Sequence, residues 1–237
     1  MKKPKGYIVY EGPSKIDGQP IVGIATTGSV NTKTGNLMQL YIIRADIRPT
    51  LATRTGDDRS VCGDCKHRHF NGGACYVMPF TGPLGVYKYY KKGGYEKLDG
   101  DYSVFDNEVL RFGAYGDPYA IPLDILISIK SRVKNSTSYT HQWIKLGSLD
   151  MEVYPTFTMA SVDNIEEKKQ AQALGFRTFR VVDHYGVMEK DEIICPNITH
   201  NVQCIDCKLC SGNQIKAKNI VVKAHGVKSK KKLKKIE

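Results

Sequence analysis

The chain has 237 residues, a formal net charge of +11, 41% hydrophobic residues and 25% charged residues. This length suits one large domain or a domain with a small metal-binding segment, and the composition is that of a globular protein. No apolar run approaches the ~20 residues that a membrane helix needs, so we expect no membrane partner. The N-terminal residues lead into a strand-like stretch rather than a long apolar signal region, which predicts a cytoplasmic protein.

The positive charge is concentrated at the C-terminal end. Residues 227–237 contain six lysines and one glutamate, so they supply +5 of the total of +11 and leave +6 for the rest of the chain. We interpret this stretch as a basic, disordered tail. It could add salt-sensitive affinity for nucleic acid, but the charge alone does not predict such a partner.

The first third of the chain has the pattern of strands followed by a loop. Strands are predicted at residues 7–11, 20–25 and 38–43, because β-branched and aromatic residues there are separated by Gly, Pro and Asn. A polar turn at residues 31–36 separates the second and third of these strands. Residues 59–80 then form a predicted loop around the adjacent Gly72 and Gly73.

From residue 109 onward, strands and helices alternate. Strands are predicted at residues 109–112, 136–140, 156–160, 177–182 and 219–223. One helix is predicted over residues 118–133, with isoleucines at four-residue spacing on one face. A second helix is predicted from a cap at Ser161 or Asp163 to Leu174, ended by Gly175. This alternation is typical of a parallel sheet covered by helices, so we predict an α/β fold.

Polar residues follow the ends of four consecutive predicted strands. In parallel α/β folds, ligands bind at the C-terminal ends of strands. We therefore predict one polar pocket that contains Arg111, Asp117, His141, Ser161 and Arg180 as its catalytic or substrate-lining residues.

Simpler interpretations of these residues remain open. Asp117 could cap the helix that begins at Pro118, and His141 could be a buried, hydrogen-bonded imidazole or a surface residue. Arg111 is harder to explain structurally, because a buried guanidinium needs a partner, for which Asp117 is a candidate.

The seven cysteines form two groups, which are predicted to bind metal. They are Cys62, Cys65 and Cys75 in the first group and Cys195, Cys204, Cys207 and Cys210 in the second. An odd number cannot pair completely in disulfides, and the cytosol keeps thiols reduced. Thiolates are soft ligands that favour zinc, copper or iron–sulfur clusters.

The second group has the spacing of an iron–sulfur ligand set. The two-residue gaps between Cys204, Cys207 and Cys210 match the start of ferredoxin-type motifs, and Cys195 could supply the fourth ligand of a 4Fe-4S cluster. A four-cysteine zinc site is the direct alternative.

The first group has only three thiols. If His67 or His69 supplies a fourth ligand, the site is a closed structural zinc site. If neither does, a 4Fe-4S cluster would keep one iron open, as in radical S-adenosylmethionine enzymes. The usual cysteine spacing of those enzymes differs from the spacing of Cys62, Cys65 and Cys75.

Several motifs together resemble those of uncharacterised proteins encoded by bacteriophages and prophages. They lie at residues 31–36 with Gln39, 61–65, 74–77, 111–122, 139–143, 159–163, 175–180, 195–210 and 225–226. The chain is similar, more distantly, to gene-product-88-type phage proteins, which in turn look like radical S-adenosylmethionine barrels. The resemblance implies a phage protein in the host cytoplasm. It also implies that Asn31, Lys33 and Tyr76 bind a cofactor, for which S-adenosylmethionine is the candidate. It implies no particular reaction.

Together, these features predict an irregular or partial parallel (β/α) barrel. Residues 1–190 would form the barrel with the first cysteine group, 191–226 a cysteine-rich metal-binding segment, and 227–237 the tail. The expected function is that of an iron–sulfur enzyme of radical type, with a reactive first cluster and an auxiliary second one. The phage context suggests a nucleotide or nucleic acid as substrate.

The alternative is a zinc-stabilised, non-catalytic protein that binds nucleic acid or a host partner. Besides the lysine tail, residues 88–92 support it, because lysines there flank Tyr89 and Tyr90, which could stack on bases.

Overall fold

The structure is a computed structural model that describes residues 4–29 and 31–224. Ten strands form one sheet in the order β4-β1-β2-β3-β5-β6-β7-β8-β10-β9. The strands are β1 (Gly6–Pro13), β2 (Pro20–Thr26), β3 (Met38–Arg44), β4 (Glu96–Lys97), β5 (Val109–Tyr115), β6 (Asn135–Thr140), β7 (Met159–Val162), β8 (Thr178–Val182), β9 (Glu192–Ile194) and β10 (Asn219–Lys223). The helices are α1 (Pro49–Thr55), α2 (Arg59–Cys62), α3 (Gly82–Tyr90), α4 (Leu123–Lys130), α5 (Ser148–Phe157), α6 (Ile165–Ala173), α7 (Pro196–His200) and α8 (Cys204–Cys207).

The sheet is mostly parallel, which confirms the predicted α/β class. β1, β2 and β3 are antiparallel neighbours, whereas every pairing from β3 across to β9 is parallel. In the described part of the chain, no backbone pairing joins the edge strands β4 and β9. The barrel part of the prediction is therefore not confirmed.

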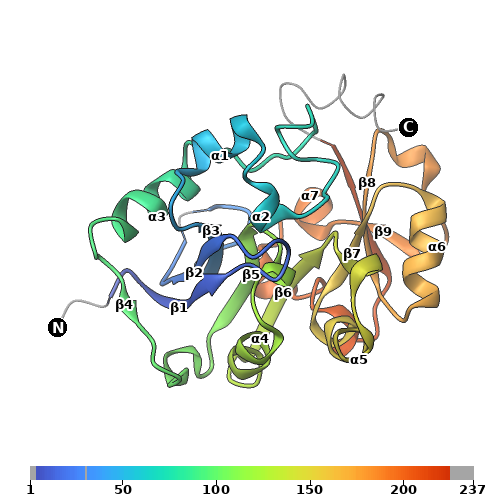
Figure 1. The fold of residues 1–237 in the computed structure, drawn as a ribbon. Helices are drawn as coiled ribbons and strands as arrows, with labels where there is room; N and C mark the ends of the chain where they lie inside the picture. Colours follow the sequence, from blue (N-terminus) through green and yellow to red (C-terminus); the bar gives the residue numbers. More distant parts are fainter. Residues whose placement is uncertain (1–3, 30, 225–237) are drawn as a thin grey trace.

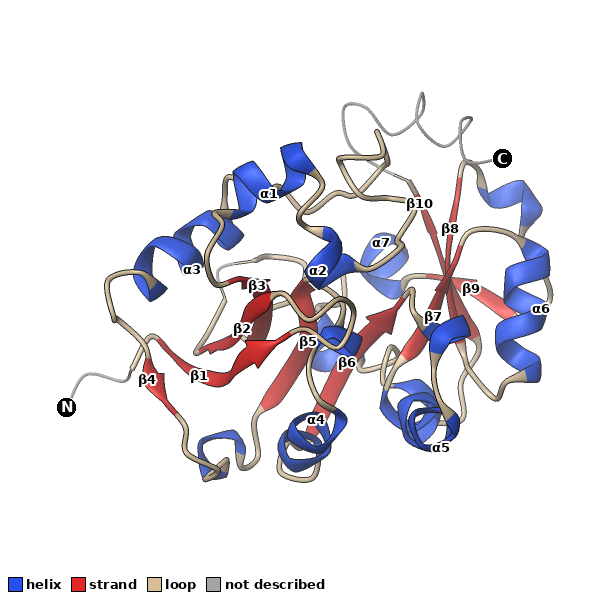
Figure 2. Ribbon diagram, in the orientation of Figure 1, coloured by secondary structure: helices blue, strands red, loops and turns tan. Residues whose placement is uncertain are grey.

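The strands from β5 to β8 are wound in one direction. Each lies beside the one that precedes it, and α4, α5 and α6 form the three connections. Parallel crossovers are almost always right-handed, so such a series places its helices on one face of the sheet. Figure 1 and Figure 2 show these helices on the outer side of the strands, with α7 and the loop after α2 on the other side. We call that other side the inner face.

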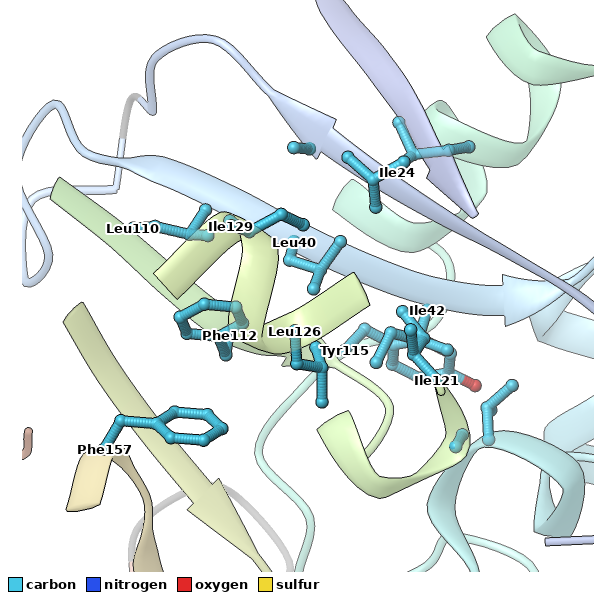
Figure 3. Close-up of a cluster of buried hydrophobic side chains, with 14 of the residues drawn as sticks. Ile24, Leu40, Ile42, Leu110, Phe112, Tyr115, Ile121, Leu126, Ile129 and Phe157 are labelled. Atoms are coloured by element: carbon cyan, nitrogen blue, oxygen red, sulfur yellow. The ribbon is translucent and has the colours of Figure 1, made fainter. Parts of the chain in front are cut away.

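The main hydrophobic core lies between the outer face and its helices, and extends beneath β2 and β3. Leu110 and Phe112 of β5 contact the same cluster as Leu126 and Ile129 of α4, and all four are fully buried. Figure 3 shows them together with Ile24, Leu40, Ile42 and Phe157. Burying each such side chain contributes ~1.5–3 kcal/mol, so this layer fixes which strand residues face outward.

Two predicted elements differ from the structure. The helix expected over residues 118–133 is a short 3₁₀ turn at Pro118–Ala120 followed by α4, because Pro122 is extended (φ −51°, ψ 139°) and interrupts it. The strand expected at residues 156–160 begins only at Met159, since Phe157 ends α5. The sequence pattern hid α5 because Pro155 lies inside it.

The remaining predicted strands are present within a few residues of their expected positions. The cap of α6 is neither Ser161 nor Asp163 but Asn164, whose side chain accepts a hydrogen bond from the Glu167 N–H (2.8 Å). The cysteine-rich residues 191–224 contribute β9 and β10 to the same sheet. The predicted tail at 227–237 lies outside the described residues. Within them, we find no helix with the length and apolarity required for a membrane span.

Candidate functional site

A cavity of about 270 Å³ lies on the inner face of the sheet, at the C-terminal part of the parallel strands. Its floor comes from alternate strand residues, which include Arg111 of β5, Tyr139 of β6, Ser161 of β7 and Phe179 of β8. Successive side chains of a strand point to opposite faces. The same alternation that buries Leu110 and Phe112 against α4 therefore turns Arg111 toward the cavity.

Most of the residues predicted from sequence line this one cavity. They are Asn31, Lys33, Cys62, Cys65, Cys75, Tyr76, Arg111, Asp117, His141, Ser161, Cys195 and Cys204. Arg180, Cys207 and Cys210 are not among its lining residues. The structure thus brings together residues that the sequence separates by more than 170 positions.

Arg180 is on the outer face of the sheet rather than in the cavity. Its neighbours Phe179 and Val181 line the cavity, so the alternation of β8 turns Arg180 away from it. There its Nε and Nη2 donate to the two carboxylate oxygens of Glu192, at 2.8 and 2.6 Å. We therefore assign Arg180 to the fold and not to the site.

The first cysteine group is held by a loop with a buried ion pair. Arg68 donates to the carboxylate of Asp58 and to the carbonyls of Gly56 and Gly63, which frames the turn that carries Cys62 and Cys65. The Cys75 N–H donates to the His67 carbonyl (2.9 Å) and so returns the third cysteine to the first two.

Gly73 makes this return possible. A Cβ atom at residue 73 would lie 2.3 Å from the carbonyl carbon of His67, which is closer than non-bonded atoms approach. Only glycine therefore lets the backbone at residue 73 approach the backbone of His67 this closely.

The second cysteine group is attached both to the sheet and to the loop that contains Asn31 and Lys33. The Cys195 N–H donates to Val221 of β10 (3.0 Å), whereas the Cys204 N–H donates to the carbonyl of Lys33 (3.1 Å). The hydroxyl of Tyr139 is hydrogen-bonded to Cys210. Residues near the two ends of the chain are thus joined at one wall of the cavity.

All seven cysteines are free thiols, and most have a raised pKa. Burial raises the pKa of Cys62 well above its ordinary value, with Asp58 and Cys65 adding to the effect. Burial likewise raises the pKa of Cys210 to about 12, and the other three thiols of its group contribute in the same direction. Each group therefore places several thiols where a cation would be needed to stabilise the thiolates.

The sulfur atoms are not arranged for a single tetrahedral ion. Within residues 4–29 and 31–224, no three cysteine sulfurs are close enough together to hold one metal ion as they stand. The geometry therefore does not confirm the predicted cysteine metal sites.

Arg111 lies between the two cysteine groups. Burial raises the pKa of Cys75 in the first group and of Cys204 in the second, and the positive charge of Arg111 opposes the rise at both thiols. One guanidinium nitrogen, Nη2, donates to the hydroxyl of Tyr76 (2.6 Å), while Nε is buried without a hydrogen-bond partner. Asp117 is not its partner, and none of the described carboxylates lies within 4.0 Å of it. Burial lowers the pKa of Arg111, but the tyrosine neighbours more than offset this, so the group stays charged.

Asp117 joins the ends of β5 and β6. Its carboxylate accepts hydrogen bonds from the Tyr119 N–H (3.0 Å), the Thr140 hydroxyl (2.8 Å) and the His141 N–H (2.8 Å). The predicted capping role is therefore present, together with a bond across to β6. Burial outweighs these bonds and raises its pKa to about 6.

Sequence reasoning missed one group of side chains at this site. His67, His141 and Asp163 come from the loop after α2 and from the residues after β6 and β7, and their ligand-type atoms lie within 4.8 Å of one another. The sequence favours Asp163 as a helix cap, yet this residue follows the cavity-lining Ser161 by two positions. That spacing was the available signal, because alternate residues of an extended segment point to the same side.

The tyrosines at residues 88–92 already have partners within the chain. The ring of Tyr89 packs edge-on against Tyr95 at 4.8 Å, and the hydroxyl of Tyr90 donates to Glu11. This arrangement gives little support to base stacking by these two residues.

No protein-family model, curated protein or solved structure matches this chain.

Proposed function

We propose that this protein is an iron–sulfur enzyme of radical type that acts on an anionic substrate, with a nucleotide or nucleic acid as the substrate class. One observation carries the proposal. The first cysteine group and two cysteines of the second, Cys195 and Cys204, line one cavity together with the charged Arg111, which interacts electrostatically with a thiol of each group.

The cysteine spacing in the sequence supports a polynuclear centre over a single zinc ion. The two-residue gaps between Cys204, Cys207 and Cys210 match ferredoxin-type ligand sets, in which each thiolate binds a different iron of a 4Fe-4S cluster.

The first group is the proposed reactive site, because it offers three thiols and neither of the histidines that follow Cys65 in the described sequence, His67 and His69, contacts a thiol through Nε2. The Nε2 atom of His69 donates to the Val77 carbonyl (2.9 Å), and the Nε2 atom of His67 lies 2.6 Å from Asp163 Oδ1, so both nitrogens contact oxygen atoms rather than thiols. A 4Fe-4S cluster held by Cys62, Cys65 and Cys75 would keep one iron open and supply one-electron chemistry, such as the reduction of S-adenosylmethionine.

The cavity residues would bind and orient the reactants. Arg111 lines the cavity with a charged guanidinium, which suits a carboxylate or phosphate oxygen. Asn31, Lys33 and Tyr76 line the same space and are the proposed cofactor-binding residues. Ser161 and His141 complete the wall at the ends of β7 and β6.

Two further points of the proposal depend on the resemblance to phage proteins. One is the choice of a nucleotide or nucleic acid as substrate. The other is a partial barrel, with which the one-way winding from β5 to β8 is compatible.

The test is the metal content of protein purified without oxygen. We expect a brown protein with about eight irons and eight sulfides per chain if both groups bind a 4Fe-4S cluster. Cys62→Ala and Cys204→Ala should then each remove about half of the iron. A colourless protein with one or two zinc ions would contradict the proposal and favour the zinc-stabilised alternative.

Substrate binding is tested separately at Arg111. In the iron-loaded protein, Arg111→Met should weaken binding of S-adenosylmethionine or of a nucleotide by roughly 10–100-fold, because a charge-assisted hydrogen bond contributes ~1.5–3 kcal/mol. Arg59→Met is the matched control, since its guanidinium is exposed and paired with Asp64.

A further inference from the structure

His67, His141 and Asp163 form a compact nitrogen- and oxygen-containing group beside the first cysteine group. The ring of His67 lies 5.7 Å from that of His141, edge to face, and its Nε2 is 2.6 Å from Asp163 Oδ1. Each residue reaches this point from a different element, so the fold, and not local sequence, assembles the group.

The hydrogen bonds of the group are incomplete. The Nε2 atom of His141 is buried and has no hydrogen-bond partner. A buried, unpaired ring nitrogen is costly, because it has lost its bonds to water and gained nothing in return. A cation at this position would bind the Nε2 atom of His141 through the lone pair of the neutral imidazole.

The hydrogen bond between His67 and Asp163 lies where such a cation would bind. Both side chains are at most 8% exposed, and their 2.6 Å contact joins two potential ligand atoms through one hydrogen bond. Metal sites commonly form where a divalent ion replaces such a proton, and the ligands are then a neutral imidazole and a carboxylate. His67 and His141 both line the cavity, so an ion bound here would face it.

We propose that His67, His141 and Asp163 bind one divalent first-row transition metal ion, such as iron(II) or zinc(II). The ligand-type atoms lie within 4.8 Å of one another, close to the ~3–4 Å separation of atoms that share an ion through bonds of ~2.0–2.2 Å. Two imidazoles and one carboxylate on one side of the ion leave its other positions open to the cavity. This site is separate from the cysteine groups and does not depend on whether they bind iron.

The chemistry of the ligands separates this site from the thiols. Manganese(II) prefers carboxylate, imidazole and water ligands and binds thiolates poorly. We therefore use manganese(II) alone as the probe, added to the full chain without oxygen. The free ion is counted by its electron paramagnetic resonance signal, which is lost on binding.

We expect one manganese per chain in the wild type and in Cys204→Ser. His141→Ala and Asp163→Asn should each weaken this binding at least about 10-fold, because each removes one of three ligands. His184→Ala is the matched control, since that imidazole is 57% exposed on its side chain and lies at the surface. It should bind manganese like the wild type.

Folding is checked in each variant by circular dichroism and thermal melting. His141→Gln provides a second variant of similar size if His141→Ala does not fold. The proposal is overturned if the folded wild type binds no manganese, or if its affinity is unchanged in His141→Gln and Asp163→Asn. Loss of manganese in Cys204→Ser would also overturn it, because the ion would then be held by thiols. Iron content has no part in any of these outcomes, so a failure here is distinguishable from a failure of the iron–sulfur proposal.

Discussion

Replacing Glu192 by glutamine tests whether Arg180 belongs to the fold or to the site. The two side chains form a two-pronged ion pair on the outer face of the sheet, and neither is more than 3% exposed. Arg180 Nη2 also donates to the Val187 carbonyl (2.9 Å), which ties the loop after β8 to the same point. Glu192→Gln would leave a buried guanidinium without its countercharge.

The expected loss of stability follows from this burial. Removing one partner of a buried ion pair costs ~3–5 kcal/mol, because the remaining charge has neither water nor a partner. In a domain of this size, each kcal/mol lowers the melting temperature by roughly 2–4 °C, so we expect a decrease of about 6–20 °C. Replacing both partners, Arg180→Met with Glu192→Leu, should recover part of the loss, since the guanidinium is then removed as well and the buried Lys168, 3.9 Å from Glu192, keeps its pairs with Glu189 and Asp191.

The assay is thermal and urea unfolding of the full chain, together with its iron content. Asp106→Asn is the matched control, because its pair with Arg132 is 43–50% exposed and should contribute no more than ~1 kcal/mol. A change below ~1 kcal/mol in Glu192→Gln would refute the assignment. So would a loss of iron without a loss of stability, since Arg180 would then act in the cavity.

Three further predictions concern Glu192, Asp117 and Gly73. Burial raises the pKa of Glu192, but the hydrogen bonds from Arg180 outweigh it and leave the pKa below its ordinary 4.5. The ionised Glu192 therefore stabilises the fold above pH 4.5, and this stabilisation is lost as the pH falls through the folded pKa. In urea unfolding, the difference in free energy of unfolding between wild type and Glu192→Gln should narrow at lower pH. Asp117→Asn should lower the free energy of unfolding by ~1–3 kcal/mol, because an amide has only one oxygen for three donors, and equal urea midpoints would contradict this. Gly73→Ala should displace Cys75 and remove about half of the iron measured in the purified protein, whereas Gly85→Ala, with nothing within 4 Å, should keep all of it.

Local patterns predicted most of the sheet and failed where packing overrode them. The β-branched runs at residues 20–25 and 38–43 are strands because their side chains are buried on both faces. α5 was missed since Pro155 normally ends a helix, yet Tyr154 and Phe157 are buried in the core and keep it helical. Here tertiary contacts outweigh a local signal.

The sequence by itself determined which chemical groups this protein has available. Cysteine spacing identified two groups of soft ligands, and the polar residues after successive strands indicated one pocket, because parallel strands end at the same edge of a sheet. Both features depend only on the positions of residues along the chain. They could be derived without knowing any distance.

Only the tertiary structure decided which of these groups face one another. The alternation within β8 turned Arg180 outward, since Phe179 and Val181 occupy the inner face. The fold also joined His67, His141 and Asp163, which are up to 96 positions apart in the chain. Such contacts depend on the register of strands and the path of a loop, and neither is encoded in the spacing of any one motif.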